Sequence, residues 1–150
     1  MNNDIKIVID AGHGGADSGA LGNGLQEKDY TLLIAKYLKN RFDELGVRSV
    51  LVRDTDETVS PSDRVNRILN SFGNSSDVLL LSNHINAGGG EGSEVIYALR
   101  NNDTLSNMIL NNLGKEGLKM RKVYQRRLPN APESAPPWPA SITILISLFI

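Results

Sequence analysis

The chain has 150 residues, of which 40% are hydrophobic and 22% are charged, and its formal net charge is -1. This length and composition fit one soluble domain that can bury a core without covalent cross-links. The sequence has no cysteine, which excludes disulfides, thiolate metal ligands and cysteine nucleophiles. A transition-metal site would therefore use histidine and carboxylate. The near-neutral charge and the lack of a basic cluster argue against nucleic acid as a partner.

Neither end of the chain carries a recognisable membrane or export signal. Residues 1–4 have no cationic stretch followed by a long apolar run, so the sequence predicts no secretory signal peptide. The apolar run at residues 142–150 is too short to span a bilayer. We therefore expect no membrane span, and a protein that stays in the cytoplasm or leaves it by a route other than a cleaved signal.

The first half of the chain alternates strands and helices. A β-branched run at residues 5–9 predicts a buried strand, and it leads into the glycine-rich turn Asp10-Ala11-Gly12-His13-Gly14-Gly15. Residues 17–24 have the composition of a loop. A helix is expected from near Glu27 to near Gly46, a strand over 47–52, and a second helix over 63–72.

The second half continues the same alternation. Residues 77–82 are almost all apolar, as in a strand of a parallel sheet covered on both faces, and they lead to a turn containing His84. A loop at 88–92, a strand over 94–99 and a helix over 102–117 follow. The pattern predicts a single α/β domain with a mainly parallel, twisted sheet flanked by helices.

The last part of the chain has a different composition. Five of the six prolines lie within residues 128–140, which excludes a helix or an interior strand there. We therefore divide the chain into a core at 1–127, a proline-rich loop at 128–140, and a β-branched stretch at 141–150 that is an atypical candidate for the last strand of the same domain.

The two histidines of the chain are the main candidates for chemistry. His13 and His84 each follow a predicted buried strand, and parallel strands place their carboxyl ends at one edge of the sheet. Their imidazoles can therefore converge on one ion, with Glu27 as the best candidate for a third ligand. A His-Glu-His set that leaves one position for water is typical of catalytic zinc sites, where zinc lowers the pKa of water to about 7.

Structural interpretations of the same residues remain open at this point. Glu27 also fits a first-turn carboxylate that stabilises a helix dipole by up to about 1 kcal/mol. His84 fits a polar residue that caps a loop. Asp10 and Asp17 fit turn or supporting roles better than direct ligation, and Asp10 is a candidate for orienting a histidine ligand.

Several separated motifs together resemble a known family. The segments at residues 7–15, Glu27-Lys28-Asp29, residues 82–87 and Gly92-Ser93-Glu94 are similar, in order and spacing, to zinc-dependent N-acetylmuramoyl-L-alanine amidases of the amidase-3 type. These enzymes occur among bacterial cell-wall hydrolases, including autolysins, and phage endolysins. The resemblance implies one zinc ion held by His13, Glu27 and His84, and a substrate contact at Asn86.

The resemblance also implies the reaction and the partner. Members of this family cleave the amide between the lactyl group of N-acetylmuramic acid and L-alanine of the stem peptide, so the expected partner is peptidoglycan. Such enzymes often carry a separate wall-binding domain, and this chain is expected to be the catalytic part of a longer protein. An endolysin, or a hydrolase released by a mother cell, would fit the expected cytoplasmic location before release.

The C-terminal stretch departs from the family pattern. Members have a last strand resembling Leu-Leu-Val-Glu-x-Gly-Phe, whose glutamate is the general base, whereas this chain has Ser147 at the equivalent position. A serine hydroxyl cannot replace a carboxylate base. Three explanations follow: an altered or frame-shifted C-terminus, a natural inactive form, or a base supplied elsewhere, for which Glu94 and Glu133 are weak candidates.

Three functions are therefore compared. The first is a peptidoglycan amidase that is impaired in this form because the expected base is missing. The second is a non-catalytic, zinc-containing wall-binding or regulatory module, which the missing glutamate favours. The third is another zinc peptidase on a related α/β scaffold, which a test of muropeptides against free peptides would separate from the first.

Overall fold

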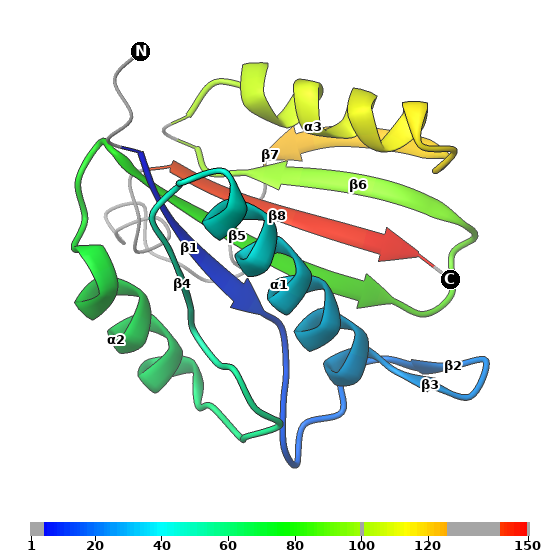
Figure 1. Ribbon diagram of the computed structural model, residues 1–150. Coiled ribbons are helices and arrows are strands. Elements are labelled where there is room, and N and C mark those ends of the chain that lie inside the picture. The colour runs from blue at the N-terminus through cyan, green and yellow to red at the C-terminus, as the bar shows by residue number, and fades with distance from the viewer. Residues whose placement is uncertain (1–4, 100, 126–141, 150) are drawn as a thin grey trace.

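The computed structural model describes residues 5–99, 101–125 and 142–149. Its centre is a six-stranded sheet with the strand order β4-β1-β5-β8-β6-β7. The strands are β1 (Lys6–Ala11), β4 (Ser49–Leu51), β5 (Val78–Asn86), β6 (Gly92–Tyr97), β7 (Met120–Gln125) and β8 (Ile142–Phe149). All neighbouring strands are parallel except β6 and β8. The predicted α/β class with a mainly parallel sheet is confirmed (Figure 1).

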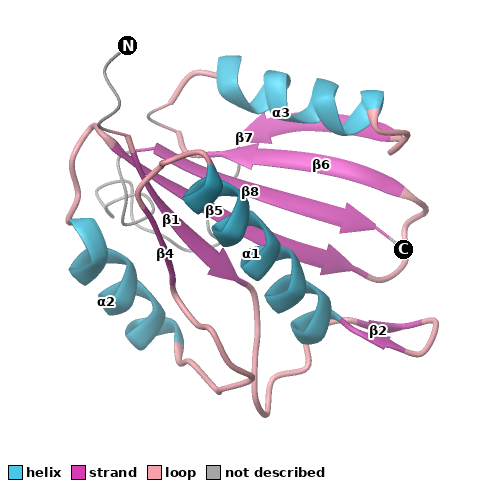
Figure 2. Ribbon diagram, viewed as in Figure 1, coloured by secondary structure: helices cyan, strands magenta, loops and turns pink. Residues whose placement is uncertain are grey.

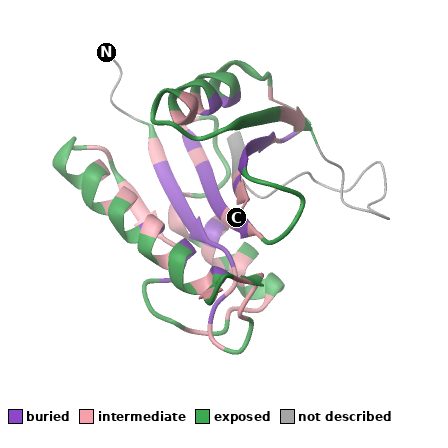
Figure 3. Cartoon of the chain, turned by 90° about the vertical axis from the view of Figure 1, so that its right-hand side faces the viewer, coloured by how far each residue is buried: buried purple, intermediate pink, exposed green. Residues whose placement is uncertain are grey.

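Three helices cover the two faces of this sheet (Figure 2). On one face, α1 (Glu27–Glu44) and α3 (Thr104–Lys115) contribute Ala35 and Leu110 to a core with Ile9 and Leu81. On the other face, α2 (Pro61–Phe72) packs Ile68 against a second apolar cluster. Alternate residues of β1 point to opposite faces, so a continuous apolar strand can serve both cores. Figure 3 shows that the buried residues are concentrated in the central strands.

Local sequence signals explain where the helices begin and end. Ser60 accepts a hydrogen bond from the backbone N–H of Asp63, and Pro61 occupies the first position of α2, which together start this helix two residues before the predicted boundary. The first helix begins at Glu27 as predicted, and the chain leaves it at Gly46, whose φ of 68° favours glycine.

Three strands were not predicted from the sequence, and a fourth was predicted too short. A small hairpin of β2 (Leu21–Gly22) and β3 (Leu25–Gln26) lies within the region expected to be a loop. The edge strand β7 was not predicted, because most of its residues are exposed and polar. The fifth strand continues to Asn86, so His84 lies inside a strand and not on a turn after it.

The C-terminal stretch does form a strand of the main sheet. Its eight residues pair in parallel with β5 over Leu79–Asn86 and antiparallel with β6, so β8 lies in the interior of the sheet. Within the described residues, this stretch is therefore a strand from Ile142 to Phe149. The proline-rich segment at 128–140 lies outside the described residues. No helix within the described ranges has the length and apolar character needed to cross a membrane.

Candidate metal centre

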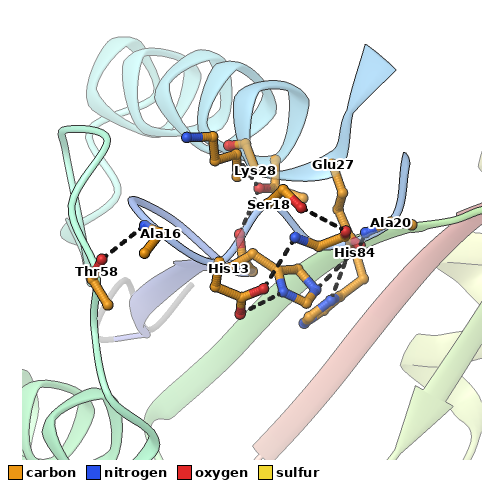
Figure 4. A network of polar contacts seen from close by, with 12 residues as sticks. His13, Ala16, Ser18, Ala20, Glu27, Lys28, Thr58 and His84 are labelled. Atoms are coloured by element: carbon orange, nitrogen blue, oxygen red, sulfur yellow. Dashed lines mark hydrogen bonds and ion pairs between the residues drawn. The ribbon is translucent and has the colours of Figure 1, made fainter. Parts of the chain in front are cut away.

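The three predicted ligands come together at the carboxyl edge of the sheet. His13 lies in the loop after β1, Glu27 is the first residue of α1, and His84 lies near the end of β5. One donor atom from each lies within 4.8 Å of the other two. Glu27 Oε1 is 2.9 Å from His84 Nδ1, and Glu27 Oε2 is 3.1 Å from His13 Nε2 (Figure 4). The predicted convergence of the two histidines is therefore confirmed.

The carboxylate of Glu27 is buried and held as an anion. Its side chain is only 3% exposed, and it accepts hydrogen bonds from the backbone N–H groups of Ala20 and Ile85. Burial by itself would raise its pKa, but the hydrogen bonds from His84 and from these two backbone groups outweigh burial and hold the pKa of Glu27 below its usual value. The helix-dipole interpretation alone does not account for these contacts.

A second carboxylate orients the first histidine. Asp17 Oδ2 is 2.9 Å from His13 Nδ1, which leaves His13 Nε2 directed at Glu27. The hydrogen bond from His13 is the main reason that the pKa of Asp17 lies below its usual value. His13 has a φ of 61°, a conformation that costs a residue with a side chain about 1 kcal/mol or more and is common at functional sites.

The expectation that Asp10 orients a histidine is wrong. Its carboxylate accepts hydrogen bonds from Arg64 and from the hydroxyl of Ser82. Asp10 lies within β1, where its carboxylate contacts Ser82 of β5 and Arg64 of α2. Asp17 lies in the loop after His13, and its carboxylate reaches the imidazole. The supporting role therefore belongs to Asp17.

Two glycines leave room for the ligand side chains. A Cβ atom at Gly12 would lie 2.5 Å from Cε1 and 2.7 Å from Nδ1 of the His84 ring. A Cβ atom at Gly19 would lie 2.6 Å from both Glu27 Oε2 and His13 Cδ2. The backbone therefore approaches the three donors more closely than any other residue type would allow.

Two arginines that the sequence analysis missed hold the loop that carries His13. Arg53 is 2% exposed and donates hydrogen bonds to the carbonyl oxygens of Ala11, Gly12 and Lys28. Arg64 donates to the carbonyl oxygens of Ala11 and His13. Each guanidinium offers several donors in a rigid fork, so one side chain fixes several backbone groups at once. Nothing in the local sequence around these arginines indicates this role.

The same loop is tied to the segment before α2. The backbone N–H of Ala16 donates to the hydroxyl of Thr58 (Figure 4). Lys28 Nζ lies 2.8 Å from both the Gly15 carbonyl oxygen and Asp56 Oδ2. These contacts join the start of α1 to the loop after β1. The position of His13 relative to Glu27 is therefore set by the surrounding structure as well as by their mutual contact.

The donor set fits a zinc ion. Four ligands about 2.1 Å from zinc in a tetrahedron lie about 3.4 Å from one another. Here the two carboxylate oxygens of Glu27 lie 2.9 Å from His84 Nδ1 and 3.1 Å from His13 Nε2, and one donor from each residue lies within 4.8 Å of the other two. Among the described residues, no lysine or arginine lies within ion-pair distance of Glu27. A buried carboxylate between two imidazoles is the chemistry of a site for a divalent cation.

The position next to the ligands holds a serine, as the sequence analysis expected. Ser147 is buried, pairs with His84 across β5 and β8, and pairs with Glu94 across β8 and β6. Residues that pair directly on neighbouring strands project from the same face of a sheet. The structure therefore places a hydroxyl beside the candidate ligand His84, and no carboxylate at that position.

The remaining candidates have different environments. The carboxylate of Glu94 is buried and 2.9 Å from Arg121 Nε, and it is not one of the three residues whose donors converge. Asn86 is the last residue of β5, partly exposed, and pairs with Phe149; its role as a substrate contact stays a prediction. Glu133 lies outside the described residues.

Comparison with known proteins agrees with this geometry. The family model described as N-acetylmuramoyl-L-alanine amidase matches residues 7–142. The chain belongs to the N-acetylmuramoyl-L-alanine amidase family. The predicted resemblance is therefore confirmed. The match includes all three candidate ligands and ends before Ser147.

Two amidases from Bacillus are each similar to 60% of the chain. The sporulation-specific N-acetylmuramoyl-L-alanine amidase of Bacillus subtilis is 48% identical over 94 residues, which cover 60% of this chain and 34% of the relative. The CwlM amidase of Bacillus licheniformis is 48% identical over 92 residues, which cover 60% of this chain and 35% of the relative. The matched region thus spans about a third of these relatives.

A solved amidase structure shares the fold over nearly the whole chain. The AmiC2 amidase of Nostoc punctiforme superposes with a TM-score of 0.76 at 30% identity, covering 95% of this chain and 78% of that one. The α/β architecture described above is therefore that of a solved amidase.

Proposed function

We propose that this chain is the catalytic domain of a zinc-dependent peptidoglycan amidase. The proposed reaction cleaves the amide between the lactyl group of N-acetylmuramic acid and L-alanine of the stem peptide. The observation that carries the proposal is the convergence of His13, Glu27 and His84 in a member of the amidase family. One zinc ion is the proposed cofactor, and peptidoglycan is the proposed partner.

The proposed mechanism assigns a separate task to each side chain. When bound, zinc would supply a Lewis acid that polarises the amide carbonyl and a water whose pKa is lowered to about 7. Glu27 would bind the ion through a carboxylate that is already ionised. Asp17 would hold the proton on His13 Nδ1, so that Nε2 presents its lone pair to the metal.

The proton transfers of the reaction still need a carboxylate base. Ser147 stands beside His84, where the family pattern places that base. A hydroxyl has a pKa far above neutral and does not accept a proton from water at pH 7, so we propose that this form of the chain is impaired. Loss of general acid-base assistance typically lowers a rate by about 100-fold to 10,000-fold.

Ser147 also supports a second candidate function. A domain with a complete ligand set and no base would bind peptidoglycan through the metal without hydrolysing it. Such a domain would act as a wall-binding or regulatory module. The two functions differ in turnover but not in metal content.

The test measures both quantities on the same protein. The purified chain, with and without a zinc chelator, is incubated with peptidoglycan, and released stem peptides and bound zinc are quantified. Chelator-sensitive release of peptides that begin with L-alanine supports the amidase. Stoichiometric zinc without release supports the non-catalytic module, and the absence of zinc binding contradicts both.

Two broader proposals concern the setting of this domain. The two Bacillus relatives are roughly three times longer than their matched regions, so we propose that a separate wall-binding domain accompanies this one in the whole protein. We also propose that the protein reaches the wall after release from the cytoplasm, as an endolysin or as a mother-cell hydrolase. The sporulation-specific amidase of Bacillus subtilis supports the mother-cell hydrolase.

A further inference from the structure

The pairing of β6 with β7 has a register shift at Arg121. Ser93 of β6 pairs with Met120 of β7, but the next residue, Glu94, pairs with Lys122. Arg121 is therefore an extra residue in β7, which makes it a β-bulge. Bulges leave their extra residue out of the regular pairing and turn its side chain, and they are frequent next to active sites. Figure 1 shows β7 at the edge of the sheet beside β6.

The guanidinium of Arg121 contacts three separate parts of the structure. Its Nε lies 2.9 Å from Glu94 Oε1, and its Nη1 lies 2.8 Å from the carbonyl oxygen of Gly89 and 3.3 Å from that of Gly90. Its central carbon lies 4.1 Å from the centroid of the Phe149 ring, at the end of β8. One side chain thus joins β6, β8 and the loop that follows β5.

The absence of a side chain at Gly92 leaves room for Arg121. A Cβ atom at Gly92 would lie 2.8 Å from Cγ and 3.0 Å from Cδ of Arg121, and 2.6 Å from the carbonyl oxygen of Lys119. Gly92 also has a φ of 136°, which favours glycine. The Glu94 side chain is 6% exposed, and within the described part of the chain its ion-pair partner is Arg121.

The loop that Arg121 holds begins at the metal centre. Residues 87–91 follow β5, which carries His84, and all five are exposed. Gly88, Gly89 and Gly90 all have positive φ values, so without an outside contact this backbone would sample many conformations. Its first residue, Ala87, lines a small cavity together with Ile85 and the ligand Glu27.

We propose that Arg121 is a positioning residue for substrate binding, which fixes the loop at residues 87–91 next to the cavity that Ala87 lines together with Glu27. The inference rests on the proposed function. Arg121 does not touch the metal ligands. Its bulged side chain joins the carbonyl oxygens of Gly89 and Gly90 to Glu94 and Phe149, and this holds the loop in the arrangement that binds substrate.

The test measures binding of a substrate fragment to the zinc-loaded chain. The probe is N-acetylmuramoyl-L-alanyl-D-isoglutamine, titrated by calorimetry into the unaltered chain, Arg121→Ala and Arg121→Lys. If the loop is in its binding arrangement about a tenth of the time without the arginine, the Kd of the fragment rises about tenfold in Arg121→Ala. The zinc-to-protein ratio stays unchanged.

Two controls separate positioning from a general loss of stability. Lys122→Ala changes the next residue of β7, whose ammonium lies over Tyr124, and we expect unchanged fragment binding. Amide hydrogen exchange in Arg121→Ala should be faster at residues 87–91 and unchanged in α2. Arg121→Lys keeps the charge but not the fork of donors, so its Kd should lie near that of Arg121→Ala.

The outcomes distinguish this inference from the proposed function. Unchanged fragment binding by Arg121→Ala would overturn the positioning role and leave the proposed function standing, and so would full recovery by lysine. Failure of the unaltered, zinc-loaded chain to bind the fragment would contradict the proposed function itself.

Discussion

A single methyl group at Gly12 should disable the metal centre. In Gly12→Ala the new Cβ would lie 2.5, 2.7 and 2.8 Å from three atoms of the His84 ring. Carbon atoms in contact prefer separations of 3.5 Å or more, so the ring must move by about 1 Å. Metal–ligand distances tolerate only about 0.2 Å. We therefore expect His84 to leave the ligand set.

The expected loss of zinc affinity is large. Disturbing only the hydrogen-bonded partners of metal ligands typically costs about 10-fold to 100-fold in affinity, and here a ligand itself is displaced. We therefore expect the affinity of Gly12→Ala for zinc to fall by about 100-fold or more, which corresponds to about 2.8 kcal/mol. Competition with a chelator of known affinity, followed by absorbance, measures this change directly.

A second glycine gives a matched control. In Gly22→Ala the new Cβ would lie 3.6 Å from Ala87 Cβ, an ordinary van der Waals contact, so zinc affinity should not change. Circular dichroism shows whether both variants keep the fold. A folded Gly12→Ala protein that binds zinc within threefold of the unaltered chain would refute the argument that the new methyl group displaces His84 from the ligand set.

Three further predictions follow from the site and the sheet. His13→Ala and His84→Ala should each abolish stoichiometric zinc binding, and full metal content in both variants would contradict the ligand set. Ser147→Glu should raise peptide release by about 100-fold to 10,000-fold, with Ser147→Gln as the uncharged control; no gain in a folded protein would mean that the base lies elsewhere. The hydrogen bonds from Lys6 and Ser75 lower the pKa of Asp77 from 3.8 to about 2, so this carboxylate stabilises the fold above pH 4 and loses that effect as the pH falls to 2. Urea unfolding of Asp77→Asn should therefore show a lower midpoint than the unaltered chain at pH 7 and the same midpoint at pH 2.

The convergence of His13, Glu27 and His84 could be predicted because it depends on short-range signals. Each histidine stands near the carboxyl end of an apolar strand, and Glu27 stands at the start of a strongly patterned helix. Parallel strands then bring those ends to one edge. The full length of β5 could not be predicted from local sequence, because most of its last residues are polar. They pair with β8, which lies about 60 residues later in the chain.

The other features that the sequence did not predict depend on long-range contacts or lack an apolar pattern. Arg53 and Arg64 act on backbone groups about 40 to 50 residues away, and no local pattern encodes such contacts. Asp10 and Asp17 both lie within four residues of His13 in the sequence, and only the path of the loop decides which one reaches the imidazole. The edge strand β7 has mainly exposed residues and therefore lacks an alternating apolar pattern.

The interior strand β8 is the last of the described elements to be synthesised, and the sheet is incomplete until this strand has been made. The ribosome completes residues 142–149 after every other described element, yet this strand separates β5 from β6 in the sheet. Until it is in place, two strand edges are open to pairing with other chains, which is a route to aggregation. A nascent chain that stalls just short of these residues would therefore leave the sheet in two unjoined parts, with the strand that carries His84 at one open edge.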